Sequence, residues 1–230
     1  MTDGPLIVQS DKTLLLEIDH ELAQEARRAI APFAELERSP EHVHTYRITP
    51  LGLWNARAAG LDAESVVDTL LKYSRYAVPH GLLVDVAELM DRYGRLSLKK
   101  DPAHGLILHC EDLPVMEEIL RSKRIQPLVG QRIDDQNIVV HPSERGQLKQ
   151  QLLKLGWPAE DYAGYVDGDA HAIELVQKGW ELRNYQDIAA ESFIHGGSGV
   201  VVLPCGAGKT IVGASAMARL KTTTLILVTN

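Results

Sequence analysis

The chain has 230 residues, of which 45% are hydrophobic and 24% charged, as in an ordinary globular protein with one or two domains. A net charge of −7 excludes a histone-like polycation, so any binding of DNA must use local basic patches. No run approaches the roughly 20 apolar residues that a membrane span requires, and no basic segment with an apolar run marks a secretory signal. Two cysteines, Cys110 and Cys205, form no disulfide framework, so we expect a reducing, cytoplasmic setting without a membrane partner.

The first elements alternate between strands and a helix. Residues 6–17 contain two apolar runs joined by a polar turn, which predicts a hairpin. Residues 20–37 predict a helix that ends before Ser39-Pro40. Its apolar stripe consists of Leu22, Ala26, Ile30 and Phe33. Residues 42–48 alternate between apolar and polar side chains and predict a short strand.

Three helices are predicted next, at residues 50–59, 62–75 and 80–93. Thr49-Pro50 and Asp62 carry the signals of helix starts. Glycines stand where the first and third helices would end. The apolar faces of the second and third helices consist of Val66, Val67, Leu70 and Leu71, and of Leu83, Val86, Leu89 and Met90.

A second hairpin is predicted at residues 95–100 and 105–110, and it can be assigned in two ways. With the three helices it would make a winged-helix-like unit over residues 1–94 and the hairpin. Alternatively, it belongs to the segment on its carboxyl-terminal side. There, helices at 113–123 and 143–155 flank two strands within 125–140, which would give a small α+β domain over residues 95–157. Residues 158–180 are expected to be a linker with one short strand at 171–175.

The last fifty residues have the pattern of a parallel α/β domain, expected over residues 181–230. A helix at 184–195 precedes a buried strand at 199–203. A loop at 204–208 leads into a helix at 209–220, and a second buried strand is predicted at 223–228. Strand, loop, helix and strand in this order open a parallel sheet.

The loop carries the strongest motif, Leu203-Pro204-Cys205-Gly206-Ala207-Gly208-Lys209-Thr210. A polyphosphate needs converging backbone N–H groups, a helix N-terminus and a cation. Gly206 and Gly208 supply the tight turn, and Lys209 supplies the cation for the β and γ phosphates. Thr210 supplies a hydroxyl group for Mg²⁺. We therefore expect the loop to bind the phosphates of ATP with Mg²⁺.

A second motif lies upstream, at Leu182-Arg183-Asn184-Tyr185-Gln186. The amide of Gln186 has both a donor and an acceptor, which suits N6 and N7 of adenine. Arg183 can pack on the base. The two motifs together predict an ATP site in which segment 182–186 contacts the base.

These two motifs resemble those of the XPB-type superfamily 2 helicases, in which the first glycine of the phosphate loop is relaxed, as at Leu203. Residues 45–51, 140–146 and 225–230 are also similar to that family, so the resemblance covers essentially the whole chain. It implies an ATP-dependent 3′→5′ DNA helicase or translocase acting in repair. The implied fold is a helical, winged-helix-like region and a damage-recognition-like α+β domain, followed by the start of a RecA-like lobe. The implied partners are DNA and possible repair factors such as a nuclease.

The resemblance also implies parts that would lie beyond Asn230, namely a DExH box, a second RecA-like lobe and an Arg-Glu-Asp loop. After Glu191 the sequence contains no Asp or Glu, so carboxylates for Mg²⁺ and water activation do not come after the phosphate loop. Two other interpretations stay open. One is a different P-loop translocase, such as a restriction-translocase subunit, and the other is a stand-alone module that binds DNA or a protein partner.

Grouped cations are the candidate contacts to DNA phosphates. They are Lys99, Lys100, Arg121, Lys123, Arg124, Arg145 and Lys149, with Lys154 nearby. Arg145 and Lys149 are four residues apart and would share one helix face. The nine histidines show no metal-binding spacing with the cysteines, so no metal site is expected apart from the nucleotide-bound Mg²⁺ at Thr210.

Overall fold

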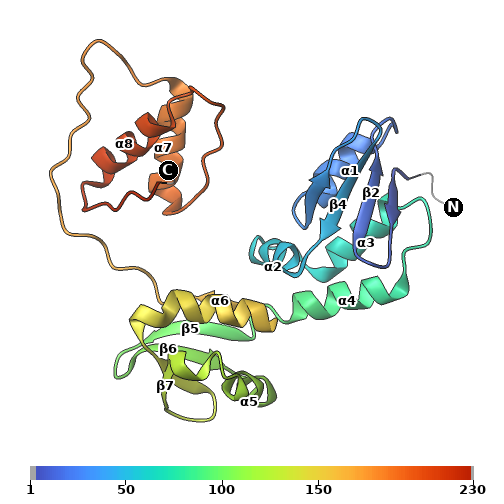
Figure 1. The fold of residues 1–230 in the computed structure, drawn as a ribbon, viewed down its shortest axis with the longest axis horizontal. Coiled ribbons are helices and arrows are strands. Elements are labelled where there is room, and N and C mark those ends of the chain that lie inside the picture. The colour runs from blue at the N-terminus through green and yellow to red at the C-terminus, as the bar shows by residue number, and fades with distance from the viewer. Residues whose placement is uncertain (1–3, 229–230) are drawn as a thin grey trace. The chain divides into compact units, whose positions relative to one another are not determined.

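A computed structural model describes residues 4–228. Their contacts divide them into two units, and the boundary in the sequence lies between Gly164 and Tyr165. The first unit contains two sheets and two hydrophobic cores that share no residue. We call its described residues 4–94 the amino-terminal lobe and its residues 95–164 the middle lobe. The second unit contains two helices and is described separately below (Figure 1).

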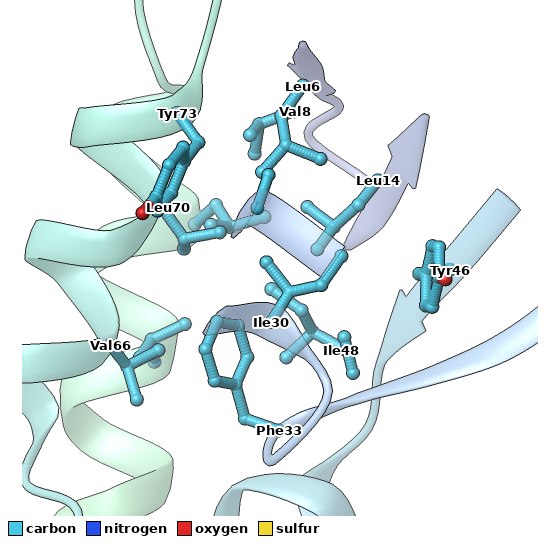
Figure 2. Packing of buried hydrophobic residues seen from close by; sticks show 14 of the residues in the cluster. Leu6, Val8, Leu14, Ile30, Phe33, Tyr46, Ile48, Val66, Leu70 and Tyr73 are labelled. Atoms are coloured by element: carbon cyan, nitrogen blue, oxygen red, sulfur yellow. The ribbon is translucent and has the colours of Figure 1, made fainter. Parts of the chain in front are cut away.

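The amino-terminal lobe has a four-stranded antiparallel sheet of order β1-β2-β4-β3. Its strands are β1 (Leu6–Val8), β2 (Thr13–Glu17), β3 (Ala34–Arg38) and β4 (Val43–Ile48). Its helices are α1 (Ala23–Ile30), α2 (Pro50–Ala58), α3 (Ala63–Tyr73) and α4 (His80–Asp91). Figure 2 shows Phe33 and Ile30 packed between Val66 and Leu70 of α3 and the sheet residue Ile48. Burial of such side chains is the main stabilising contribution to the lobe.

One predicted helix, at residues 20–37, is wrong in its second half. Helix α1 ends at Ile30, and residues from Ala34 form strand β3, which pairs with β4. The cross-strand hydrogen bonds come from β4, the next strand along the chain, and they outweigh the local preference for helix. Phe33 is buried in the connecting turn, as its apolar character requires, but Leu22 is 40% exposed.

The other predicted elements of this lobe are confirmed within a few residues. The Thr49 hydroxyl accepts a hydrogen bond from the Gly52 N–H at 3.0 Å, and Pro50 occupies the first turn of α2. The Asp62 carboxylate caps α3 by accepting from the Ser65 N–H at 2.8 Å. On α3, Val66 and Leu70 are fully buried, whereas Leu71 is 47% exposed.

The middle lobe has a five-stranded sheet of order β7-β8-β6-β5-β9. Its strands are β5 (Leu96–Asp101), β6 (Gly105–Cys110), β7 (Val129–Arg132), β8 (Asn137–Val140) and β9 (Ala159–Asp161). Helices α5 (Leu113–Arg121) and α6 (Arg145–Leu155) bury Ile119, Leu148 and Leu152 against one face of the sheet. Gly156 ends α6 in the left-handed conformation, with a φ of 90°.

The β5–β6 hairpin decides between the two interpretations of residues 95–110. Strand β6 pairs with β8, and β5 pairs with β9 in parallel, so the hairpin is the centre of the middle-lobe sheet. The winged-helix-like interpretation is therefore wrong, and residues 4–94 form an α+β lobe with its own antiparallel sheet. Strand β9 lies within the predicted linker, and the strand predicted at residues 171–175 is not formed.

The second unit contains α7 (Asn184–Gly196) and α8 (Lys209–Leu220), which lie side by side (Figure 1). Both helices agree with the sequence-based prediction. The strands predicted at 199–203 and 223–228 are wrong: these segments form no β-ladder, and Val200 and Val202 are 89% and 87% exposed. A strand requires hydrogen-bonded neighbours, and in residues 165–228 the structure has only the isolated bridge between Ala170 and Thr222. No helix in residues 4–228 has the length and apolar character to span a membrane.

Candidate nucleotide-binding site

The glycine-rich loop of residues 204–208 is a turn that leads directly into α8. Gly206 and Gly208 have φ angles of 76° and 81°, in the left-handed region that favours glycine. Gly208 is the residue before the first turn of α8, so the loop ends at the positive end of a helix dipole. Lys209 and Thr210 are exposed in that first turn.

The loop touches the start of α7 at Gly208. A Cβ atom added at Gly208 would lie 2.5 Å from Nε2 of Gln186. Gln186 is only 5% exposed, although it is polar. Two independent features therefore require glycine at position 208: the left-handed backbone angle and the close approach of Gln186.

The amide of Gln186 is hydrogen-bonded at both ends. Its Oε1 accepts from the Arg183 N–H at 3.0 Å, which is half of a capping box at the start of α7. Its Nε2 donates to the carbonyl oxygen of Ala207 at 2.9 Å. The donor and acceptor that the sequence analysis assigned to adenine therefore hold the loop in its present conformation.

Lys209 is also bound to the loop, since its Nζ donates to the carbonyl oxygen of Pro204 at 3.1 Å. A hollow of about 470 Å³ lies beside the loop. It is lined by Arg183, Tyr185, Leu203, Pro204, Cys205, Gly206 and Ala207. The structure thus brings the loop residues together with Arg183 and Gln186, as both motifs predicted.

Helices α7 and α8 are joined by a residue that the sequence analysis did not single out. The guanidinium of Arg219, near the end of α8, donates to the Glu191 carboxylate at 2.5 Å and also to that of Asp187. The side chain of Arg219 is 27% exposed. Asp187 and Glu191 are four residues apart, so they share one face of α7, and Arg219 fixes that face to the helix that begins at the loop.

The predicted DNA contacts in the middle lobe fall into two groups. Arg145 donates to both carboxylate oxygens of Asp161, at 2.9 and 2.7 Å, and Lys149 donates to the same carboxylate at 3.0 Å. The Asp161 side chain is 12% exposed. Burial raises the pKa of Asp161, but the hydrogen bonds from Arg145 and Lys149 outweigh it and hold the pKa below its usual value of 3.8.

The second group is exposed. Within residues 4–228, no ion pair or side-chain hydrogen bond is found for its members. They are Lys99, Lys100, Arg121, Lys123 and Arg124. Unpaired, exposed cations are available to phosphate groups, whereas Arg145 and Lys149 already neutralise a carboxylate. No group of three His, Cys, Asp or Glu side chains suited to a metal is found in the same residues.

Two family models match the chain. Residues 6–134 match the helicase conserved C-terminal domain, and residues 179–230 match the type III restriction enzyme, res subunit. The second match contains both motifs of the candidate nucleotide site. The first match covers more than half of the chain and defines its class, that of the helicases.

The relatives are more specific. The chain is 73% identical to a DNA 3′-5′ helicase XPB of Mycobacterium tuberculosis and 72% identical to one of Kineococcus radiotolerans, over all of its residues. It is 28% identical to the general transcription and DNA repair factor IIH helicase/translocase subunit XPB of Enterocytozoon bieneusi, over 99% of its length. The chain spans 42%, 41% and 38% of these relatives. The chain therefore belongs to the XPB-type superfamily 2 helicases.

Proposed function

We propose that this chain is the ATP-binding and DNA-contacting part of an ATP-dependent 3′→5′ DNA helicase or translocase acting in DNA repair. The observation that carries the proposal is the loop of residues 204–208 at the start of α8, with Lys209 and Thr210 in the first helical turn. The names of the bacterial relatives support the polarity and the substrate. In the complete motor the chain belongs to an enzyme, a DNA-dependent ATP hydrolase.

The loop residues have separate roles in this proposal. Backbone N–H groups from Cys205 to Gly208 surround the phosphates, which Pro204 helps to shape by restricting the turn. Lys209 leaves the Pro204 carbonyl and neutralises the β and γ phosphates. Thr210 contacts Mg²⁺ through its hydroxyl group. Glycines and a lysine at a helix N-terminus are the donor set that a polyphosphate requires.

Segment 183–186 provides the base side of the site. Arg183 packs on the adenine ring, and the Gln186 amide reads its N6 and N7. Because both ends of that amide are hydrogen-bonded within the chain, ATP competes with the Arg183 N–H and the Ala207 carbonyl for them. Adenine recognition then removes the Gln186 hydrogen bond from the Ala207 carbonyl, so base binding is coupled to the phosphate loop.

The middle lobe contacts DNA through its basic residues. The five exposed cations provide the salt-dependent contacts to phosphates. Arg145 and Lys149 contribute further contacts only where phosphate competes with Asp161 for them. The restriction-enzyme match over residues 179–230 favours a second candidate, a translocase subunit of another class. Relatives that align along the whole chain favour the first.

The test is titration calorimetry of ATP with Mg²⁺ against the 230-residue chain. Lys209→Ala should weaken binding by roughly tenfold or more, since the variant cannot make a charge-assisted hydrogen bond to phosphate. Lys178→Ala, an exposed lysine of the same unit, is the matched control and should leave the affinity unchanged. Equal affinities of the parent and the Lys209 variant would contradict the proposal. If the chain binds DNA with the same affinity in the presence and in the absence of ATP, a stand-alone binding module would be favoured.

A further inference from the structure

Tyr185 makes two hydrogen bonds at the edge of the hollow beside the phosphate loop. Its hydroxyl donates to the carbonyl oxygen of Ala207 at 2.8 Å. The same hydroxyl accepts from Nη1 of Arg183 at 3.0 Å. Tyr185 is 37% exposed and lines the hollow. The hydroxyl therefore joins a cationic side chain on the base side of the site to a backbone carbonyl of the loop.

The Ala207 carbonyl accepts two hydrogen bonds from α7, from Oη of Tyr185 and from Nε2 of Gln186. A carbonyl oxygen has two lone pairs, so two donors saturate it and fix its direction. The peptide that links Ala207 to Gly208 is planar and trans. Its N–H therefore points away from the side on which its C=O is held. With the carbonyl bound toward α7, the Gly208 N–H is directed away from α7.

We propose that Tyr185 is a positioning residue for phosphate binding, which acts by orienting the Ala207–Gly208 peptide so that the Gly208 N–H faces the polyphosphate. This inference rests on the proposed function and names a residue for it. Gln186 makes the same contact, but in the proposed function its amide turns to the adenine base. The Tyr185 hydroxyl then remains as the donor that keeps the carbonyl in place while nucleotide is bound.

The test uses Tyr185→Phe, which retains the ring and removes only the hydroxyl group. The two ligands are ATP and inorganic triphosphate, each with Mg²⁺, titrated into the 230-residue chain. Both affinities should fall, that for ATP by roughly three- to tenfold and that for triphosphate by less, because without a base Gln186 stays on the Ala207 carbonyl. Tyr76→Phe removes a hydroxyl from a tyrosine that is 55% exposed in the amino-terminal lobe, and it should change neither affinity.

The outcomes separate this inference from the function on which it rests. Unchanged affinities in Tyr185→Phe, together with a loss in Lys209→Ala, would overturn the role of Tyr185 and leave the nucleotide site standing. A loss for ATP but not for triphosphate would assign Tyr185 to the base and also overturn the proposal. If Lys209→Ala has no effect either, the proposed function itself fails.

A second measurement needs no ligand. The backbone ¹⁵N and ¹H shifts of Gly208 should change in Tyr185→Phe, because the peptide that contains its N–H loses a hydrogen bond at the carbonyl. The amide of Gly197, at the far end of α7, should not change. Identical Gly208 shifts in the parent and in Tyr185→Phe would show that the hydroxyl does not orient this peptide.

Discussion

Gly208 lies where the phosphate loop, α7 and α8 meet. Its φ of 81° disfavours any Cβ, and a Cβ there would lie 2.5 Å from the Gln186 amide nitrogen. We expect Gly208→Ala to cost about 1–2 kcal/mol of stability, because an L-residue is strained in this region. It should also reduce ATP affinity by roughly tenfold or more, because the strained residue cannot keep the left-handed backbone that presents the loop N–H groups to phosphate. Thermal unfolding and ATP titration measure the two effects.

Gly213 provides the matched control for this substitution. It is exposed within α8, and a Cβ there would meet no atom within 4 Å. Gly213→Ala should stabilise the helix by about 0.5–1 kcal/mol and leave ATP affinity unchanged. Equal tolerance of alanine at both positions would mean that the close approach at Gly208 is not maintained in solution.

Asp161 gives the middle lobe a defined dependence on pH. Its folded pKa is lowered, so its ion pairs contribute stability above the unfolded pKa of about 3.8, and that contribution is lost as the pH falls through the folded value. Asp161→Asn should lower the free energy of unfolding by about 1–3 kcal/mol at pH 7, because the two cations lose the negative charge and one of the two acceptor oxygens. Denaturation curves of parent and variant should converge in acid below the folded pKa.

Asp135 is the control for Asp161. It also pairs with an arginine, Arg132, at 3.4 Å, but its side chain is 82% exposed. Exposed ion pairs contribute little, so Asp135→Asn should be near neutral at every pH. A difference between parent and Asp161→Asn that stays constant into strong acid would contradict the assignment to ionisation.

The middle lobe has two kinds of basic residue: those on α6 pair with Asp161, and those in the segment after α5 are exposed and, within residues 4–228, unpaired. Replacing Lys123 and Arg124 with alanine should weaken DNA binding and reduce the salt slope by about one for each phosphate that is no longer neutralised. Replacing Arg145 and Lys149 should also flatten the slope if α6 faces DNA, and it should destabilise the lobe because Asp161 loses its partners. Affinity measured against salt concentration, together with unfolding, resolves the two effects. An unchanged slope in the α6 variant would assign Arg145 and Lys149 to Asp161 alone.

Elements with local signals could be predicted from the sequence, and elements fixed by distant partners could not. Thr49-Pro50, Asp62 and Gly156 mark helix ends through their own side chains or their own φ angles. Strand β3 exists because β4 pairs with it, and β9 exists because β5 does. No short window of sequence around β9 contains its partner, and the helical spacing of residues 20–37 hides the pairing of β3 with the nearby β4.

The same distinction applies to the candidate site. The glycines, Lys209 and Gln186 were predictable because a polyphosphate and a base require those residue types. The roles of Tyr185 and Arg219 depend on partners 22 and 28 residues away in the chain. The four-residue spacing of Asp187 and Glu191 was the only available signal that α7 presents a face to a cation.

At the scale of the whole chain, we expect no ATP hydrolysis, with or without DNA. The phosphate-binding half of the site is present, but no carboxylate comes after Glu191, and both Asp187 and Glu191 are bound to Arg219. Phosphoryl transfer depends on metal placement and on stabilisation of the transition-state charge. A DNA-stimulated ATPase assay on residues 1–230 checks this, with Lys209→Ala as the control. Turnover in the parent that the control abolishes would mean that upstream acids supply the catalytic carboxylates.

The two hydrophobic cores of the first unit share no residue, and one contact between the lobes is made by Arg92, whose guanidinium lies 5.0 Å from the centre of the Trp157 ring. Because the two cores consist of different residues, we expect heat to melt the lobes in separate steps. Calorimetry would then record a van't Hoff enthalpy smaller than the total heat absorbed. A single melting temperature quoted for this chain would average over two transitions, and the stability effect of any substitution has to be attributed to the lobe that contains it.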